Sequence, residues 1–238
     1  MIKEVDMNNK KEEASAVILV PEPYAGLAYS FGWDRMKKFF LDLFLITLIV
    51  GVVWIPYSIM LSLDGRYTPG GGILQIFGLA YLLLLMAPID YGSAFVFLKA
   101  VRSEQFEVKD MFLVFEKNYI NVVLANLLHW GIVSLGIFLF FIPGIIFACR
   151  LAFVKYIVLD RKMDPVEAVK ESWRMTKGHA GKIFLMGLLA IPIVIAGLIC
   201  LGVGVIPAVM WIRCAFASMY YAVSESEEGA VQEEEVKE

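Results

Sequence analysis

Apolar stretches too long for a soluble core constrain this chain more than any other feature of its sequence. A bilayer core about 30 Å thick is crossed by roughly 20 helical residues, each adding about 1.5 Å. Residues 120–159 are mostly apolar and reach about twice that length. Of the 238 residues, 59% are hydrophobic, whereas an ordinary soluble domain has roughly 45–50% apolar residues. We therefore predict an all-α, polytopic transmembrane helical bundle.

Six spans are predicted, arranged as three helical hairpins. Pro143-Gly144 divides the run 120–159, and Gly202-Val203-Gly204 with Pro207 divides a second long run, because proline and glycine interrupt helices. A turn-rich linker from Asp64 to Pro69, followed by three glycines, separates the first two spans. The predicted spans are residues 39–61, 73–97, 120–141, 145–159, 183–201 and 206–223.

The distribution of basic residues predicts the orientation. Lys and Arg precede the first span and fill the loops after the second and fourth, whereas the opposite side has only Arg66. Short cytoplasmic loops collect basic residues. We expect a multi-pass protein of a prokaryotic plasma (inner) membrane with both termini cytoplasmic. Its predicted parts are a cytoplasmic segment 1–23, a six-span membrane domain 24–223 and an acidic, disordered cytoplasmic tail 224–238.

A short similarity recurs in the even-numbered spans. Each has an Ala-Phe pair after a proline: Ala94-Phe95 after Pro88, Ala152-Phe153 after Pro143, and Ala215-Phe216 after Pro207. Each odd-numbered span follows a stretch with aromatic and basic residues. We interpret the chain as three tandem units, each an interfacial amphipathic segment followed by a transmembrane hairpin. Chance matching of a common dipeptide is the alternative.

The best-defined interfacial segment precedes the fifth span. Asp164-Pro165-Val166-Glu167 has the cap, proline and acid of a helix start. The helix that follows is amphipathic, and we expect its Trp173, Arg174 and Lys177 to lie at the headgroup level near anionic lipid. Docking into a soluble partner and packing beneath the bundle are the alternatives.

Ionisable residues within the apolar runs are the candidate functional residues. Asp90, Arg150 and Arg213 align at nearly one depth, and each charge costs at least ~2.5–3.5 kcal/mol at the centre of a span. Asp90 could pair with either arginine and leave the other for a lipid phosphate, a substrate anion or a partner's carboxylate. A purely structural ion pair is the alternative. Lys155 lies nearer a span end, where snorkelling explains it, and we expect His129 to be a packing residue.

Motifs of known catalytic sites are missing from the sequence. It has no GxxxxGK[ST], HExxH, GxSxG or CxxC pattern, and its net charge of −3 lacks the basic excess of nucleic-acid-binding proteins. We expect no catalysis, no cofactor, no metal and no nucleic-acid partner.

Several segments together resemble a known family. They are Phe141-Ile142-Pro143-Gly144-Ile145, Arg150-Leu151-Ala152-Phe153, Val158-Leu159-Asp160 and the stretch from Ala168 to Gly178. The chain resembles uncharacterised prokaryotic six-span proteins related to the membrane domain of glycerophosphoryl diester phosphodiesterases, best over residues 139–190. The resemblance implies a helical membrane domain of undefined role. It carries over no catalytic residue, because the phosphodiesterase chemistry resides in a soluble barrel domain.

Two functions remain open on the sequence. The first is a non-catalytic scaffold or accessory subunit that binds membrane lipids or a partner membrane protein. The second is a small transporter or lipid-moving protein with a polar intramembrane site. A water-accessible cavity around Asp90, Arg150 and Arg213 favours the transporter, and a sealed salt bridge favours the scaffold.

Overall fold

The computed structural model describes residues 23–63, 71–200 and 204–235, and the regular structure in these ranges is helical, with no strand. The predicted all-α class is confirmed. The predicted loop of the first hairpin and most of the predicted N-terminal segment lie outside the described residues. In chain order the elements are α2 (Ala25–Lys38), α3 (Phe40–Leu63), α4 (Gly71–Tyr81), the π-helix η1 (Leu82–Met86), α5 (Ala87–Arg102), the 3₁₀ helix η2 (Val108–Phe112), α6 (Val114–Lys117), α7 (Tyr119–Leu139), α8 (Phe141–Arg150), α9 (Val154–Asp160), α10 (Pro165–Met175), α11 (Ala180–Ile199) and α12 (Val205–Glu235).

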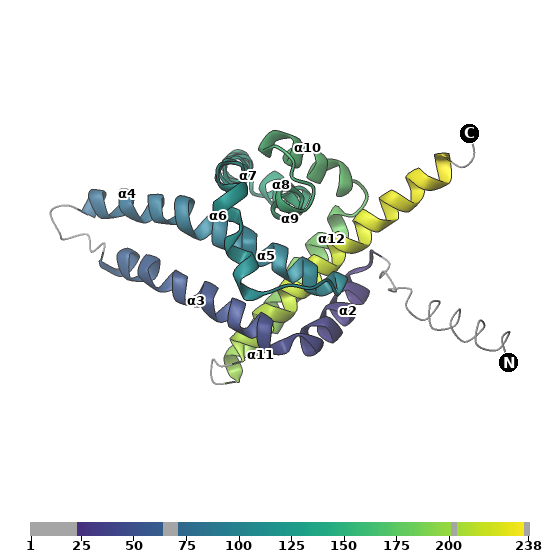
Figure 1. Ribbon diagram of the computed structural model, residues 1–238. Helices are drawn as coiled ribbons and strands as arrows, with labels where there is room; N and C mark the ends of the chain where they lie inside the picture. Colours follow the sequence, from purple (N-terminus) through teal and green to yellow (C-terminus); the bar gives the residue numbers. More distant parts are fainter. Residues whose placement is uncertain (1–22, 64–70, 201–203, 236–238) are drawn as a thin grey trace.

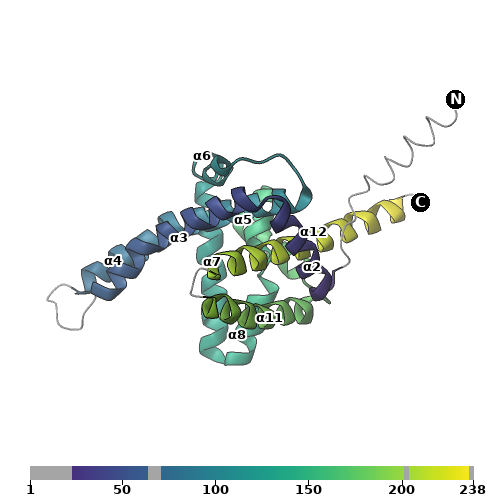
Figure 2. The same cartoon turned by 90° about the horizontal axis from the view of Figure 1, so that it is seen from below.

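In the described part of the chain, six helical segments are long and apolar enough to cross a membrane, which confirms the predicted number of spans. They pair as hairpins, α3 with α4, α7 with α8, and α11 with α12. Figures 1 and 2 show the three hairpins diverging from a shared centre. The segments are Phe40–Met60, Gln75–Arg102, Tyr119–Leu139, Ile142–Asp160, Ala180–Ile199 and Val205–Glu227.

Odd-numbered and even-numbered spans differ in burial. The odd spans are buried over only 17%, 28% and 17% of their most apolar stretch, whereas the even spans are buried over 61%, 44% and 56%. The odd spans are also the more hydrophobic, with mean hydropathies of 2.3, 2.0 and 2.4 against 1.7, 1.9 and 1.3. The even spans thus form the protein core, and the odd spans carry the apolar surface suited to lipid.

The interfacial segments connect the three units into a closed ring. The 3₁₀ helix η2, which begins unit two, packs on α5 of unit one. Likewise α10, which begins unit three, packs on α9 of unit two, and α2, which begins unit one, packs on α12 of unit three. In each case the interfacial segment of one unit packs on the second span of another unit. The repeat itself stays a prediction.

Two of these contacts need glycine. A Cβ on Gly32 of α2 would lie 2.8 Å from the backbone nitrogen of Ala215 in α12. A Cβ on Gly92 of α5 would lie 2.0 Å from the carbonyl oxygen of Met111 in η2. Backbones therefore approach more closely here than any side chain allows.

Proline 88 explains the π-helix in the second span. Proline lacks an N–H group and clashes with the carbonyl four residues earlier, which here belongs to Leu84. The π-helix ends just before Pro88, and the Tyr119 hydroxyl donates to the Leu84 carbonyl at 2.9 Å. The proline stays inside a continuous span because a neighbouring helix satisfies the released carbonyl.

The corner between the third and fourth spans lies earlier than predicted. Phe140 is extended (φ −159°, ψ 143°), and Pro143 and Gly144 fall in the first turn of α8, where a missing N–H costs no helical bond. Gly144 instead permits close packing, because its Cβ would lie 2.7 Å from the Ile137 nitrogen in α7. The predicted hairpin is confirmed, but the prediction that Pro143-Gly144 forms its turn is wrong.

The C-terminal segment differs from the predicted disordered tail. Helix α12 continues to Glu235. The Ser224 and Ser226 hydroxyls donate to backbone carbonyls three residues earlier, and glutamate is a good helix former. Glu227 also pairs with Arg174 of α10 at 2.9 Å. These contacts and propensities allow a helix despite the acidic composition.

Candidate functional site

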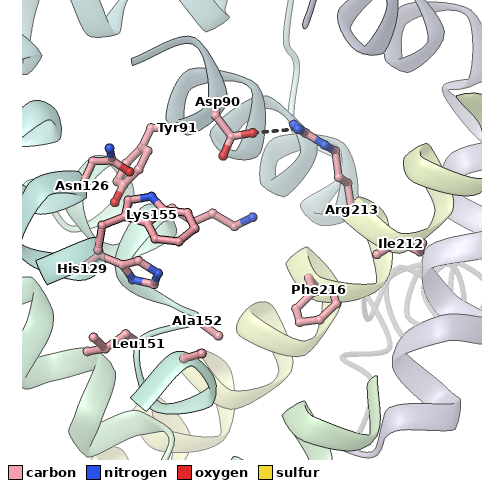
Figure 3. Close-up of a pocket in the computed structure, with 12 residues that line it drawn as sticks. Asp90, Tyr91, Asn126, His129, Leu151, Ala152, Lys155, Ile212, Arg213 and Phe216 are labelled. Atoms are coloured by element: carbon pink, nitrogen blue, oxygen red, sulfur yellow. Dashed lines mark hydrogen bonds and ion pairs between the residues drawn. The ribbon is translucent and has the colours of Figure 1, made fainter. Parts of the chain in front are cut away.

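A polar cavity of about 380 Å³ lies among the spans. Its walls come from α5, α7, the α8–α9 span and α12, so all three units contribute (Figure 3). A volume in this range suits a small molecule or the headgroup of a larger one. The lining residues are Asp90, Tyr91, Asn126, His129, Trp130, Ala148, Leu151, Ala152, Lys155, Ile212, Arg213 and Phe216.

Asp90 and Arg213 form an ion pair at one side of the cavity. A guanidinium nitrogen of Arg213 lies 2.7 Å from the Asp90 carboxylate, and the other terminal nitrogen donates to the Ser93 hydroxyl at 2.5 Å. The guanidinium also lies 5.9 Å from the Phe97 ring centroid. The structure thus brings together two of the three predicted ionisable residues, on α5 and α12. The Asp90 side chain remains 41% exposed.

Lys155 supplies a second cation to the cavity. Its ammonium points into the space between the Asp90 and Phe216 side chains (Figure 3). No described carboxylate lies within the 4.0 Å that defines an ion pair with this ammonium. An ammonium group has three donors, so Lys155 can bind an anion that enters the cavity.

Arg150, the third predicted residue, lies away from this cavity. Its guanidinium stacks over the Trp173 ring at 5.4 Å and donates to the Trp173 carbonyl at 3.4 Å. The helix breaks at Leu151–Phe153, between α8 and α9. The Arg150 carbonyl there accepts bonds from Ser172 and Thr176. The repeat alignment predicted that Arg150 lies with Asp90 and Arg213, but in the structure Lys155 lines the cavity with them and Arg150 does not.

Neutral polar groups complete the cavity wall. Asn126, His129 and Trp130 come from α7, where a spacing of three or four residues places side chains on one helix face. His129 therefore lines the cavity, which the sequence interpretation missed, and this spacing was the available signal. Among the described residues, no group of three His, Cys, Asp or Glu side chains could hold a metal ion.

The predicted interfacial residues lie on and just after α10. Three residues of α10 are buried, Ala168, Ser172 and Met175, whereas Trp173 is 42% exposed. Arg174 pairs with Glu171 at 2.7 Å and with Glu227 of α12. The hydrogen bond from Arg174 lowers the pKa of Glu171 below its ordinary value and raises the pKa of Arg174. Helix α10 therefore packs on α7 and α9 along one side and leaves Trp173 partly exposed on the other.

A separate ionic cluster joins the three even spans. Arg102 of α5 binds Asp160 of α9 through two nitrogens, at 2.5 and 2.8 Å. The Tyr220 hydroxyl of α12 donates to the same carboxylate at 2.8 Å. A bidentate ion pair between an arginine and a carboxylate is a strong interaction, and here the two charges balance. The cluster therefore stabilises the packing of the three units against one another.

Six candidate spans and a charged cavity among them define the class: this is a multi-pass α-helical membrane protein. A family model described as "Protein of unknown function (DUF975)" matches residues 129–227. This stretch is less than half of the chain and includes His129, Lys155 and Arg213 but not Asp90.

The family match confirms the resemblance to an uncharacterised protein family. The further relation to the membrane domain of phosphodiesterases stays a prediction. No curated protein and no solved structure matches the chain.

Proposed function

We propose that this protein is a non-catalytic integral membrane protein that binds a membrane lipid, with the lipid's anionic headgroup in the cavity. The observation that carries the proposal is Lys155. Its ammonium points into a polar cavity within the candidate spans and has no described carboxylate partner. The cavity has two cations and one carboxylate. An excess charge is costly in this environment, so an anion that neutralises it binds favourably.

Membrane lipid is the partner best suited to this position. The cavity lies among helices whose other faces are apolar and exposed, including Trp130 beside the cavity at 57% exposure. A lipid can place its phosphate near Lys155 and keep its acyl chains against the odd spans. The resemblance to a membrane domain found with glycerophosphoryl diester phosphodiesterases also fits a lipid ligand.

The absence of catalysis is part of the same proposal. At the cavity the charged groups are an ion pair, Asp90 with Arg213, and the ammonium of Lys155. Catalysis by covalent attack commonly uses a Ser, Cys or Thr nucleophile held by a base, and none of these residue types is among the described residues that line the cavity. We place the protein in a prokaryotic plasma membrane with both termini cytoplasmic. We propose the exposed face of α10, which includes Trp173, as the surface for a partner membrane protein.

Lipid movement is the second candidate function, and the cavity itself favours it. A carrier needs a polar site within the membrane, and the Asp90 side chain is exposed to this space. The Asp90–Arg213 pair instead favours a fixed binding site. Fluorescent-lipid translocation in proteoliposomes separates the two functions, because only a carrier accelerates exchange between leaflets.

Native mass spectrometry of the full chain, purified in mild detergent, tests the lipid proposal. Lys155→Met should lose most of the anionic phospholipid that copurifies with the wild type. Lys162→Met is the matched control, because it removes an exposed lysine outside the cavity and should retain the lipid. Equal lipid content in the wild type and Lys155→Met would contradict the proposal.

A further inference from the structure

The charges of the cavity point to the charge of its ligand. Lys155 and Arg213 are cationic and Asp90 is anionic, so the site has one excess positive charge when His129 is counted as neutral, as in the formal charge. We propose that the cavity selects a phospholipid headgroup with a single net negative charge, a phosphodiester without a cationic substituent. This inference rests on the proposed lipid-binding function and specifies its ligand.

The Asp90–Arg213 ion pair leaves Lys155 as the excess cation of the cavity. Arg213 already donates to the Asp90 carboxylate and to the Ser93 hydroxyl, so its charge is largely compensated. Lys155 alone is left to neutralise an incoming anion. Asn126, His129 and Tyr91 can bond to ester and hydroxyl groups but add no charge to this count.

Other headgroups fit this balance less well. A phosphomonoester carries about −1.5 to −2 at pH 7, which leaves excess negative charge beside the Asp90 carboxylate. A zwitterionic headgroup brings its own cation and leaves the site positive. In a medium of low dielectric constant, either imbalance costs more than it would in water. Both classes should therefore bind more weakly than the monoanion.

Lipid titrations of the full chain in detergent, followed by native mass spectrometry, test this selection. The probes are phosphatidylglycerol, phosphatidic acid and phosphatidylcholine with identical acyl chains. The wild type should prefer phosphatidylglycerol to each of the others by about tenfold, the effect of one charge-assisted hydrogen bond. Equal affinity for phosphatidylglycerol and phosphatidic acid would overturn the inference.

Two variants change the charge of the site in opposite directions. Asp90→Asn adds one positive charge and should shift the preference toward phosphatidic acid. Lys155→Met removes the excess charge and should abolish the preference for phosphatidylglycerol over phosphatidylcholine. Because Lys155 has no described ion pair to lose, this variant should fold even if Asp90→Asn does not. Unchanged selectivity in folded Lys155→Met would overturn the inference.

A competition arm separates a lipid from a soluble ligand. Dimethyl phosphate is a water-soluble phosphodiester with one negative charge. If the ligand is a lipid, dimethyl phosphate at the same concentration as phosphatidylglycerol should not displace it, because dimethyl phosphate lacks acyl chains. Displacement at equal concentration would overturn the lipid-binding function while leaving the charge selection standing, whereas lipid binding without charge selection would overturn only the present inference.

Discussion

At the scale of single residues, the Asp90–Arg213 pair explains how the candidate spans tolerate two charges. Removing one partner leaves the other uncompensated, which is costly within a membrane. We expect Arg213→Leu to insert into the membrane but to unfold at a lower temperature. In a double-mutant cycle with Asp90→Asn, the two residues should couple by about 1–3 kcal/mol. Thermal unfolding in detergent measures this energy, and strictly additive effects would show that the pair contributes nothing.

Two of the charged cavity residues could be predicted from the sequence, and a third could not. Asp90 and Arg213 could be identified because charged residues are rare in apolar sequence, and the structure brings the two together. Lys155 was not predicted as a site residue because it lies nearer a span end, where snorkelling explains a charge. At the break, Leu151–Phe153, the Arg150 carbonyl accepts hydrogen bonds from the hydroxyls of Ser172 on α10 and of Thr176 just after it. Such tertiary contacts leave no local signal in the sequence.

At the scale of elements, glycine contacts set how closely the interfacial segments approach the even spans. Gly92→Ala should destabilise the protein, because the added Cβ would collide with the Met111 carbonyl. Gly187→Ala in α11 is the control, since nothing lies within 4 Å of its Cβ. Alanine is favoured over glycine in helices by roughly 1 kcal/mol, so this control should be neutral or stabilising. Comparable melting temperatures for the two variants would refute the close-packing account.

The stabilisation that Glu171 of α10 gains from its ion pairs with Arg161 and Arg174 should depend on pH. The folded-state pKa of Glu171 is lowered by its hydrogen bond from Arg174, so its stabilisation is present above the ordinary glutamate pKa. It is lost as the pH falls through the lowered value. Melting temperatures of the wild type and Glu171→Gln should therefore converge as the pH drops from 6 to 3. A constant difference across this range would exclude ionised Glu171 as the stabilising group.

At the scale of the whole molecule, the packing of three units in a ring explains why the even-numbered spans are more buried than the odd-numbered spans. The number of spans followed from helix length and apolar runs, which are local properties. The ring did not, because the packing of α2 on α12 joins opposite ends of the chain. Hydropathy gives the order of spans along the sequence but carries no information about which units are neighbours.

The topology gives a whole-molecule prediction. Single cysteines at position 68, outside the described residues, and at Lys170 on α10 should be labelled from opposite sides of the membrane. Basic loops stay cytoplasmic. The second, third and fourth spans lie between position 68 and Lys170, and an odd number of spans places the two positions on opposite sides. A membrane-impermeant maleimide on intact cells provides the measurement. Labelling of both positions from one side would exclude the six-span topology.

The central claim is that Lys155 binds the phosphate of a lipid inside the cavity. An experimental structure of the full chain in nanodiscs containing phosphatidylglycerol tests it most directly. The account predicts headgroup density within hydrogen-bonding distance of the Lys155 Nζ atom, with the Asp90–Arg213 pair intact beside it. A cavity that holds only water under these conditions, with lipid confined to the outer helix faces, would contradict it.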